Sequence, residues 1–269
     1  SLLVSEFGAD RIATISPAGF KTGSFGSTGV GDGQFLGPQF LAGDGEGHLY
    51  VSDYGNARIS KFTVDGEFLF SFGDGSDGSG RLTSPAGIVV TDGRVYVADT
   101  RQSRIVVFDE SGNRIGEIVT AQMDAPEGLS LYRPGELLVS DGNLVYVINI
   151  QTERVSILSE LNERRRILGA VVDANRNLIA VDFRSSSVLV MAASEELYTG
   201  LNVELSFVEA AEHPLVYAAV TVTDRNGRPL LGLDETNFRI TEDRFPTGEA
   251  ELVHAGYREQ DAAVSVVVD

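Results

Sequence analysis

The sequence contains no cysteine, which excludes disulfide bridges and thiolate metal sites. Its three histidines are His48, His213 and His254, and only the first lies in the repeated part of the chain described below. A histidine-based zinc site in that part would therefore lack ligands. No apolar stretch approaches the roughly 18 residues of a membrane-spanning helix. We therefore expect no membrane insertion from these residues.

Positive charge is scarce. Lysine and arginine together number 21 against 39 acidic residues, which gives a formal net charge of −18. Such a surface repels phosphate backbones and anionic lipid, so nucleic-acid binding and docking on a lipid surface are not expected. The one basic run is Arg164–Arg166. A solvated connection before a strand accounts for it, and an anionic partner is the alternative.

Glycine is abundant, at 30 of 269 residues, and it marks the turns of an internal repeat. Five apolar segments align, and each ends in an acidic residue. Those acids are Glu6, Asp53, Asp99, Asp141 and Asp182. We expect them to cap turns by accepting backbone N–H groups from the turn that follows, with a ligand-binding role as the alternative.

Each unit contains hairpin signals such as Asp65-Gly66 between alternating apolar residues. The second unit predicts four strands, at Gln39–Ala42, Leu49–Ser52, Ile59–Thr63 and Phe68–Phe72. A four-stranded antiparallel sheet repeated about every 40–45 residues is typical of a β-propeller blade. We therefore predict an all-β fold, in which small residues let neighbouring blades approach near the axis. Those residues are Gly87, Gly128 and Gly169.

Residues 31–73 resemble an NHL repeat, with Gly-x-Gly-x-Phe, then Pro, Tyr-Val-x-Asp, Asn-x-Arg-Ile and a Gly turn. Residues 82–119 match almost as well, while 122–158 and 166–192 match more loosely. The resemblance implies an NHL-type propeller over residues 1–199, with about five recognisable blades of which the outer ones are incomplete. The first unit begins at its second strand and the fifth ends at its third, so we expect a fragment that is truncated at its N-terminus.

The period ends near Thr199. Alternating strands at Val203–Val208 and Val216–Thr223 predict a small immunoglobulin-like β-sandwich over residues 200–260. Residues 201–243 resemble the sandwich that precedes von Willebrand factor A-type domains in bacterial proteins. In those domains the first strand ends in an Asp that helps to hold a divalent cation. Residues 261–269 would then be the first strand of such a domain, with Asp269 a ligand only if the parent chain continues; an ordinary strand is the alternative.

The propeller offers little for catalysis. The positions at the mouth of the channel are Gln39, Ala86, Glu127 and Leu168, which do not make a calcium site. Residues 73–78 miss the spacing of an EF-hand loop, and no Gly-x-Ser-x-Gly elbow occurs. We therefore predict no catalytic residue and no cofactor in this stretch of chain, although a divalent cation remains an expectation for the domain beyond it.

The loops after the second strands are the better candidates for binding, because aromatic and arginine side chains on loops are common in protein interfaces. The predicted partner-binding residues are Phe7, Tyr54, Arg101, Gln102, Phe183 and Arg184. The alternative is that these aromatic residues cover neighbouring blades. We predict a non-catalytic scaffold for protein–protein interaction or adhesion, extracytoplasmic in a bacterium by resemblance. The alternatives are a metal-dependent lyase or lactonase and a ligand-sensing ectodomain.

Overall fold

The computed structural model describes residues 2–75, 81–162, 164–174, 176–191, 202–209, 216–224, 227–228, 241–242, 245–246, 250–254 and 264–268. It divides into two compact units, Ser1–Met191 and Ala192–Asp269. The described elements are β-strands and three short 3-10 helices, which confirms the all-β class. None of the described helices is long and apolar enough to cross a membrane.

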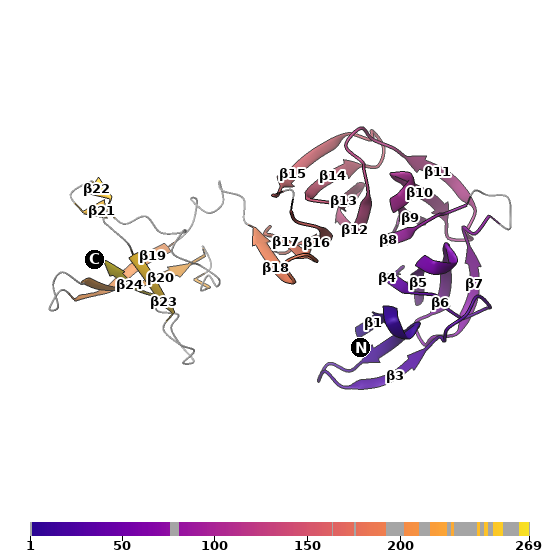
Figure 1. Cartoon of the computed structure of the whole chain (residues 1–269), viewed down its shortest axis with the longest axis horizontal. Coiled ribbons are helices and arrows are strands. Elements are labelled where there is room, and N and C mark those ends of the chain that lie inside the picture. The colour runs from indigo at the N-terminus through magenta and orange to yellow at the C-terminus, as the bar shows by residue number, and fades with distance from the viewer. Residues whose placement is uncertain are drawn as a thin grey trace. The chain divides into compact units, whose positions relative to one another are not determined.

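The first unit consists of five antiparallel sheets in chain order (Figure 1). Sheet 1 contains β1 (Leu2–Glu6), β2 (Arg11–Ile15) and β3 (Lys21–Phe25). Sheet 2 contains β4 (Pro38–Gly43), β5 (His48–Asp53), β6 (Arg58–Thr63) and β7 (Phe68–Phe72). Sheet 3 contains β8 (Pro85–Thr91), β9 (Arg94–Asp99), β10 (Arg104–Asp109) and β11 (Arg114–Ile118).

Sheet 4 contains β12 (Pro126–Arg133), β13 (Glu136–Asp141), β14 (Leu144–Asn149) and β15 (Val155–Glu160). Sheet 5 contains β16 (Ile167–Val172), β17 (Leu178–Asp182) and β18 (Ser187–Met191). Three 3-10 helices follow second-position strands: η1 (Phe7–Ala9), η2 (Tyr54–Asn56) and η3 (Thr100–Gln102). The four strands predicted for the second unit are confirmed, and each predicted boundary lies within one residue of the observed one.

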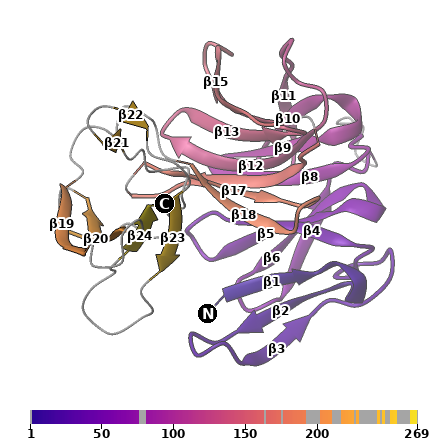
Figure 2. The same cartoon turned by 60° about the vertical axis from the view of Figure 1, so that its left-hand side comes forward.

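The sheets are arranged radially, as a propeller requires. Contacts between neighbouring sheets join β1 to β4, β4 to β8, β8 to β12 and β12 to β16. These strands lie nearest the centre in Figure 1, while β3, β7, β11 and β15 lie at the rim. Figure 2 shows the same sheets from another side, stacked one on the next. The five-bladed propeller arrangement is therefore confirmed.

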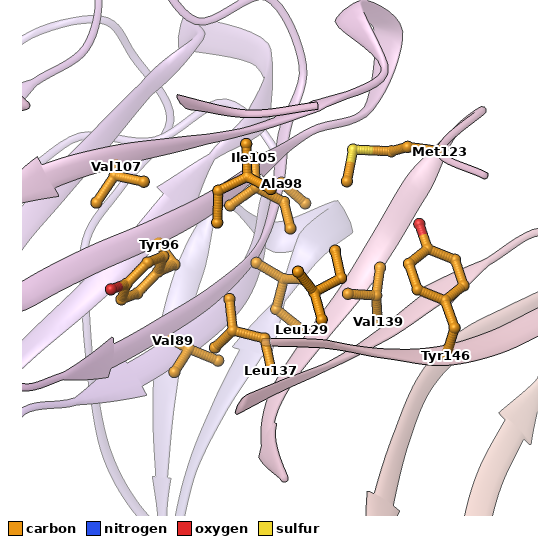
Figure 3. Packing of buried hydrophobic residues seen from close by; sticks show 12 residues of the cluster. Val89, Tyr96, Ala98, Ile105, Val107, Met123, Leu129, Leu137, Val139 and Tyr146 are labelled. Atoms are coloured by element: carbon orange, nitrogen blue, oxygen red, sulfur yellow. The ribbon is translucent and has the colours of Figure 1, made fainter. Parts of the chain in front are cut away.

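Apolar side chains fill the spaces between the sheets. Successive residues of a strand point to opposite faces, and strands such as β9 are apolar at both kinds of position, so both faces of the sheet are apolar. Between sheets 3 and 4, Tyr96 and Ile105 pack against Leu137, Val139 and other buried residues (Figure 3). The remaining neighbours are joined by similar clusters. The propeller is thus a series of sheet-on-sheet cores rather than one central core.

Two glycines allow the innermost strands to approach closely. A Cβ atom on Gly87 would lie 2.7 Å from the carbonyl oxygen of Glu127, and one on Gly128 would lie 2.7 Å from the Cα of Gly169. Both distances are shorter than real Cβ contacts, so these two predictions are confirmed. At Gly169 a Cβ would meet nothing within 4 Å, and no described sheet follows sheet 5 to test the prediction there.

The end sheets differ from the three between them. Sheet 1 has three strands and starts with β1 at the second-strand position, and sheet 5 has three strands and ends with β18 at the third. Both features agree with the sequence prediction. Among the described residues, no set of contacts comparable to those between neighbouring sheets joins sheet 5 to sheet 1. Each end sheet therefore has one face without a neighbour.

The second unit contains one four-stranded sheet in the order β19, β20, β24, β23. These strands are β19 (Asn202–Glu209), β20 (Val216–Thr223), β23 (Ala250–His254) and β24 (Val264–Val268), and β21 (Thr241–Glu242) pairs with β22 (Phe245–Pro246). The residues predicted to start a separate domain, 261–269, contribute β24 to this sheet, where it pairs with both β20 and β23. Asp269 lies outside the described residues.

Candidate functional site

One side of the propeller contains all the turns that follow the second strands, together with the connections that lead into the first strands. We call it the loop face. Because strands alternate in direction, the hairpins between first and second strands lie on the opposite side. The loop face therefore gathers one turn and one connection from each complete sheet, and all the predicted binding residues belong to it.

Asp99 shows how the repeated acid shapes this face. Its side chain is fully buried, and one carboxylate oxygen accepts bonds from the backbone N–H groups of Thr83 and Ser84 and from the Thr83 hydroxyl, at 2.7–2.9 Å. The other oxygen accepts bonds from Arg104 at 3.0 and 3.1 Å. A charge-assisted network of this kind holds the connection into sheet 3 in one position.

Asp53 holds the connection into sheet 2 in the same way. It accepts the backbone N–H of Leu36 at 2.8 Å, the amide of Asn56 at 2.7 Å and the guanidinium of Arg58 at 3.0 Å. Arg58 in turn donates to the carbonyl oxygens of Val30, Gly31 and Gln34. The Asn-x-Arg element of the repeat thus braces the connection between sheets 1 and 2.

The remaining acids differ in their partners. Asp141 accepts the backbone N–H groups of Asp124 and Ala125 and the hydroxyl of Tyr146. Glu6 instead pairs with Arg11 and Lys21, and the bond from Arg11 holds the pKa of Glu6 below its usual value.

Asp182 accepts four hydrogen bonds. Hydrogen bonds from the Ser185 hydroxyl first, then from the backbone N–H groups of Arg166 and Arg184 and from the Arg165 guanidinium, lower the pKa of Asp182 to about 2. The backbone N–H of Arg184, in the turn that follows Asp182, donates one of these bonds, as predicted. Asp53, Asp99 and Asp141 bond the backbone of the connection that precedes their sheet, which differs from the predicted arrangement.

Where the connection into sheet 5 meets the start of β12, the loop face contains a cluster from two sheets. Arg166 forms a two-bond ion pair with Glu127, in which Nε lies 2.9 Å from Oε2. The guanidinium carbon of Arg166 also lies 5.3 Å from the centre of the Phe183 ring. The bond to Glu127 raises the pKa of Arg166, and the Tyr54 hydroxyl of sheet 2 adds to that rise. We call Glu127, Arg166 and Phe183 the hub cluster.

The structure places the predicted binding residues in two groups. Phe183 belongs to the hub cluster, and the exposed Arg184 is beside it, donating to the carbonyl of Arg164. Tyr54 is linked to the cluster only through its electrostatic effect on Arg166. No contact described in the structure joins the others to the hub cluster. Those residues are Phe7, Arg101 and Gln102. Phe7 is 55% exposed, yet its ring lies where a Cβ on Gly37 would be, so it partly covers the neighbouring connection.

Sequence reasoning considered Glu127 and Arg166 separately and missed their pairing. Glu127 was expected to line the channel, and Arg166 to lie in a solvated connection. The two residues are 39 positions apart, about one repeat, and adjacent first strands bring them together. The positions of the two residues in the repeat could have indicated the pairing. Glu127 is the second residue of β12 and Arg166 immediately precedes β16, so both lie at the start of a first strand.

Arginine is concentrated on the loop face despite the chain's net charge of −18. Besides Arg166, four arginines of this face are exposed, namely Arg81, Arg101, Arg164 and Arg184. Asp32 and Asp124 are exposed acids on the same side. Glu117 and Glu160 are further exposed acids at this end of their strands. The exposed arginines are therefore the groups of this face that attract a carboxylate, within a surface that also contains acids.

Metal-binding side chains do not converge on this face. In the described ranges, no group of three or more His, Cys, Asp or Glu residues could hold a metal ion. His48 bonds Asp44 through Nδ1 at 2.6 Å in a hairpin on the opposite side. The buried acids already accept several hydrogen bonds each. What the loop face offers is an arginine stacked on an exposed aromatic ring beside a carboxylate.

Comparison with known proteins identifies the repeat. The family model for the NHL repeat matches residues 82–108. "Protein brain tumor" of Drosophila melanogaster is 26% identical over 127 residues, which is 46% of this chain and 12% of that protein. The RING finger protein nhl-1 of Caenorhabditis elegans is 38% identical over 75 residues, covering 28% of this chain and 8% of that protein. The chain thus spans about an eighth or less of these relatives.

Solved structures share the fold at low identity. A catalytically inactive virginiamycin B lyase from Staphylococcus aureus with quinupristin superposes with a TM-score of 0.53 and 15% identity, over 69% of this chain and 60% of that one. A chain of a nidogen/laminin complex gives a TM-score of 0.54 and 21% identity, over 69% and 68%. The fold therefore occurs both in a lyase and in a protein–protein complex, which leaves the presence of enzyme activity open. Residues 82–108 are thus identified as an NHL repeat, and the five radial sheets identify residues 2–191 as a β-propeller.

Proposed function

We propose that this propeller is a non-catalytic protein-binding scaffold, and that its loop face captures a partner segment that presents carboxylates beside apolar side chains. The observation that carries the proposal is the hub cluster, where Arg166 is stacked on a Phe183 ring that is 58% exposed. Aromatic residues and arginine are enriched in protein interfaces, where a few residues supply most of the binding energy.

The hub cluster is also rigid before any partner arrives. Arg166 is held by Glu127, and the turn that presents Phe183 is held by the bonds to Asp182. Side chains already held in place lose less entropy on binding, which favours affinity. The surrounding exposed arginines add attraction for an acidic segment. On the resemblance of residues 201–243 to bacterial sandwich domains, we assign this role to an extracytoplasmic bacterial protein, without a cofactor in the propeller.

The test compares two double variants against a displayed library of random peptides. Phe183→Ala with Arg184→Ala removes exposed groups from the loop face. Phe20→Ala with Arg94→Ala removes an exposed aromatic and an exposed arginine from the hairpins on the opposite side, where Phe20 is 72% exposed. Peptides selected by the parent chain should be rich in Asp and Glu next to apolar residues. The loop-face variant should bind them about tenfold or more weakly, while the opposite-side variant keeps its affinity.

Equal losses in the two variants, or selected peptides rich in Lys and Arg, would contradict the proposal. A metal-dependent enzyme is distinguished by thermal unfolding with added calcium or zinc. A resident ion would raise the melting temperature of the parent chain by mass action, and the proposal expects no such rise.

A further inference from the structure

The guanidinium of Arg166 is bonded along one of its edges. Nε donates to Oε2 of Glu127 at 2.9 Å, and Nη2 donates to Oε1 of the same carboxylate. The remaining N–H groups, on Nη1 and Nη2, form a second edge of parallel donors. Among the described residues, Glu127 is the only acceptor for this guanidinium, and the Arg166 side chain is 44% exposed. Arg166 therefore still offers a planar pair of donors to an external group.

Arg166 and Glu127 occupy positions that the other sheets fill with uncharged residues. The strand register aligns the sheets, because the first residue of each first strand pairs with the repeated acid. The residue before that strand is Arg166 in sheet 5, whereas sheets 2 to 4 have the small residues Gly37, Ser84 and Ala125. At the position of Glu127 the other sheets have Gln39, Ala86 and Leu168. Sheets 2 and 3 thus pack without this ion pair, and a departure from the repeat that packing does not require is a candidate for function.

An external carboxylate would gain little by displacing Glu127 from Arg166. It would form the same two charge-assisted bonds that the Glu127 carboxylate already forms. The Glu127 side chain, which is 14% exposed, would then be left without this partner in a mostly buried place, and that is unfavourable for a charged group. The ion pair also has no net charge, so it does not attract anions from solution. The second edge of Arg166 is therefore suited to an uncharged oxygen acceptor rather than to a carboxylate.

Phe183 and Arg184 supply the two other kinds of contact. The Phe183 ring lies 5.3 Å from the guanidinium carbon of Arg166 and is exposed, so apolar surface remains for a ligand. The next residue, Arg184, is exposed, and its Nη1 donates to the carbonyl oxygen of Arg164 at 3.3 Å. Within the described ranges, no carboxylate bonds the Arg184 guanidinium. Arg184 therefore keeps its positive charge available, whereas the charge of Arg166 is balanced by Glu127.

We propose that Glu127 is a specificity-determining residue: it makes the hub cluster bind an uncharged carbonyl oxygen of the partner, while Arg184 binds the partner's carboxylate. The occupant is an extended peptide segment. One of its backbone carbonyls accepts from the second edge of Arg166, an apolar side chain lies on Phe183, and an acidic side chain nearby in the segment reaches Arg184. The inference rests on the proposed function, because it assigns each group of that partner to a residue of the loop face. The unbalanced charge of Arg184 and the balanced charge of Arg166 separate the two roles.

The first test needs no partner. It follows the Nε–H signals of the arginine side chains by NMR while sodium acetate replaces sodium chloride at constant ionic strength. In the parent chain, acetate should shift the signal of Arg184 and leave that of Arg166 unchanged. In Glu127→Gln, which removes the charge and keeps the shape, acetate should also shift the signal of Arg166, because its charge is no longer balanced. The signal of Arg58 is the internal reference, since that side chain is buried and bonded to Asp53.

Two results of the titration would overturn the proposal. If the Arg166 signal moves as far in the parent chain as in Glu127→Gln, an external carboxylate replaces Glu127. If the Arg166 signal moves in neither chain, Glu127 is not what keeps acids from Arg166.

The second test uses a peptide that the parent chain selects from the displayed library. Each acid of the peptide is changed to its amide, and the affinity is measured for the parent chain, for Arg184→Gln and for Arg94→Gln. Arg94 is the control, because it is an exposed arginine on the opposite side. Changing the most sensitive acid should weaken binding to the parent chain and to Arg94→Gln by about tenfold and should have no effect with Arg184→Gln.

The proposal is wrong if the effect of that acid persists in Arg184→Gln and disappears in the double variant Glu127→Gln with Arg166→Gln, because Arg166 would then bind the carboxylate. If the parent chain selects no acidic peptide, the proposed function is wrong and so is the occupant named here, whereas the acetate titration still decides the role of Glu127.

Discussion

Sheets 4 and 5 have the same strand pattern, yet they differ in what covers them. Both faces of sheet 4 are buried between neighbours, while the described residues cover sheet 5 on the side of sheet 4 and leave its other face exposed. Val145 and Val188 are the same residue at the same place of the repeat, and they are 0% and 62% exposed. The alternation of side chains along a strand therefore determines which face of the sheet a residue lies on. The neighbouring sheet determines whether that face is buried.

The largest expected effect comes from truncating valines in both sheets. Val145→Ala with Val147→Ala should lower the free energy of unfolding by about 3–5 kcal/mol, because four buried methyl groups and their packing are lost. Val188→Ala with Val190→Ala should lower it by less than about 0.5 kcal/mol, since both side chains are largely in water. Urea unfolding of the two double variants measures the difference. Similar losses in both would mean that sheet 5 is covered after all.

Replacing the equivalent glycines of sheets 4 and 5 should give a smaller difference in stability. Gly128→Ala should cost about 1–3 kcal/mol, because its Cβ would press on the backbone of Gly169 in the next sheet. Gly169→Ala should be neutral or slightly stabilising, since the new methyl group meets open space and alanine restricts the unfolded chain. Melting temperatures of the two single variants provide the measurement. A large loss from Gly169→Ala would reveal a neighbour at that position.

The smallest effect comes from the pH dependence of the acid in sheet 5. The pKa of Asp182 is lowered to about 2 from 3.8, so its stabilising bonds are complete above about pH 4 and are lost as the pH falls through 2. Asp182→Asn should therefore melt below the parent chain at neutral pH, and the gap should close between pH 4 and 2. Asp65→Asn, in an exposed hairpin, controls for the loss of one negative charge. A gap that stays constant down to pH 2 would contradict the role given to Asp182.

Much of the fold could be predicted because its signals are local. The Gly-containing hairpins and the alternation of apolar residues placed the strands of sheet 2 to within a residue. The same local reasoning expected the acids to bond the turn that follows them. It could not show that Asp99 bonds Thr83 and Ser84 instead, because those residues lie 16 and 15 positions earlier and reach Asp99 only when β8 pairs with β9.

The candidate site was predicted in part. Phe183 was chosen from its place after the repeated acid, and the structure puts it in the hub cluster. Arg166 and Glu127 were visible in the sequence, but their pairing depends on the contact between first strands of neighbouring sheets. Spacing along the chain does not reveal which side chains meet near a common axis.

The sequence by itself determined the repeat, the strand boundaries and the acid that ends each second strand, because these follow from turn chemistry and from alternation within about 40 residues. Only the tertiary structure decided which faces are buried, which connection each acid holds, and which arginine meets the exposed aromatic ring. Those outcomes depend on contacts between sheets, where residues a whole repeat apart are brought together by packing that no short stretch of sequence encodes.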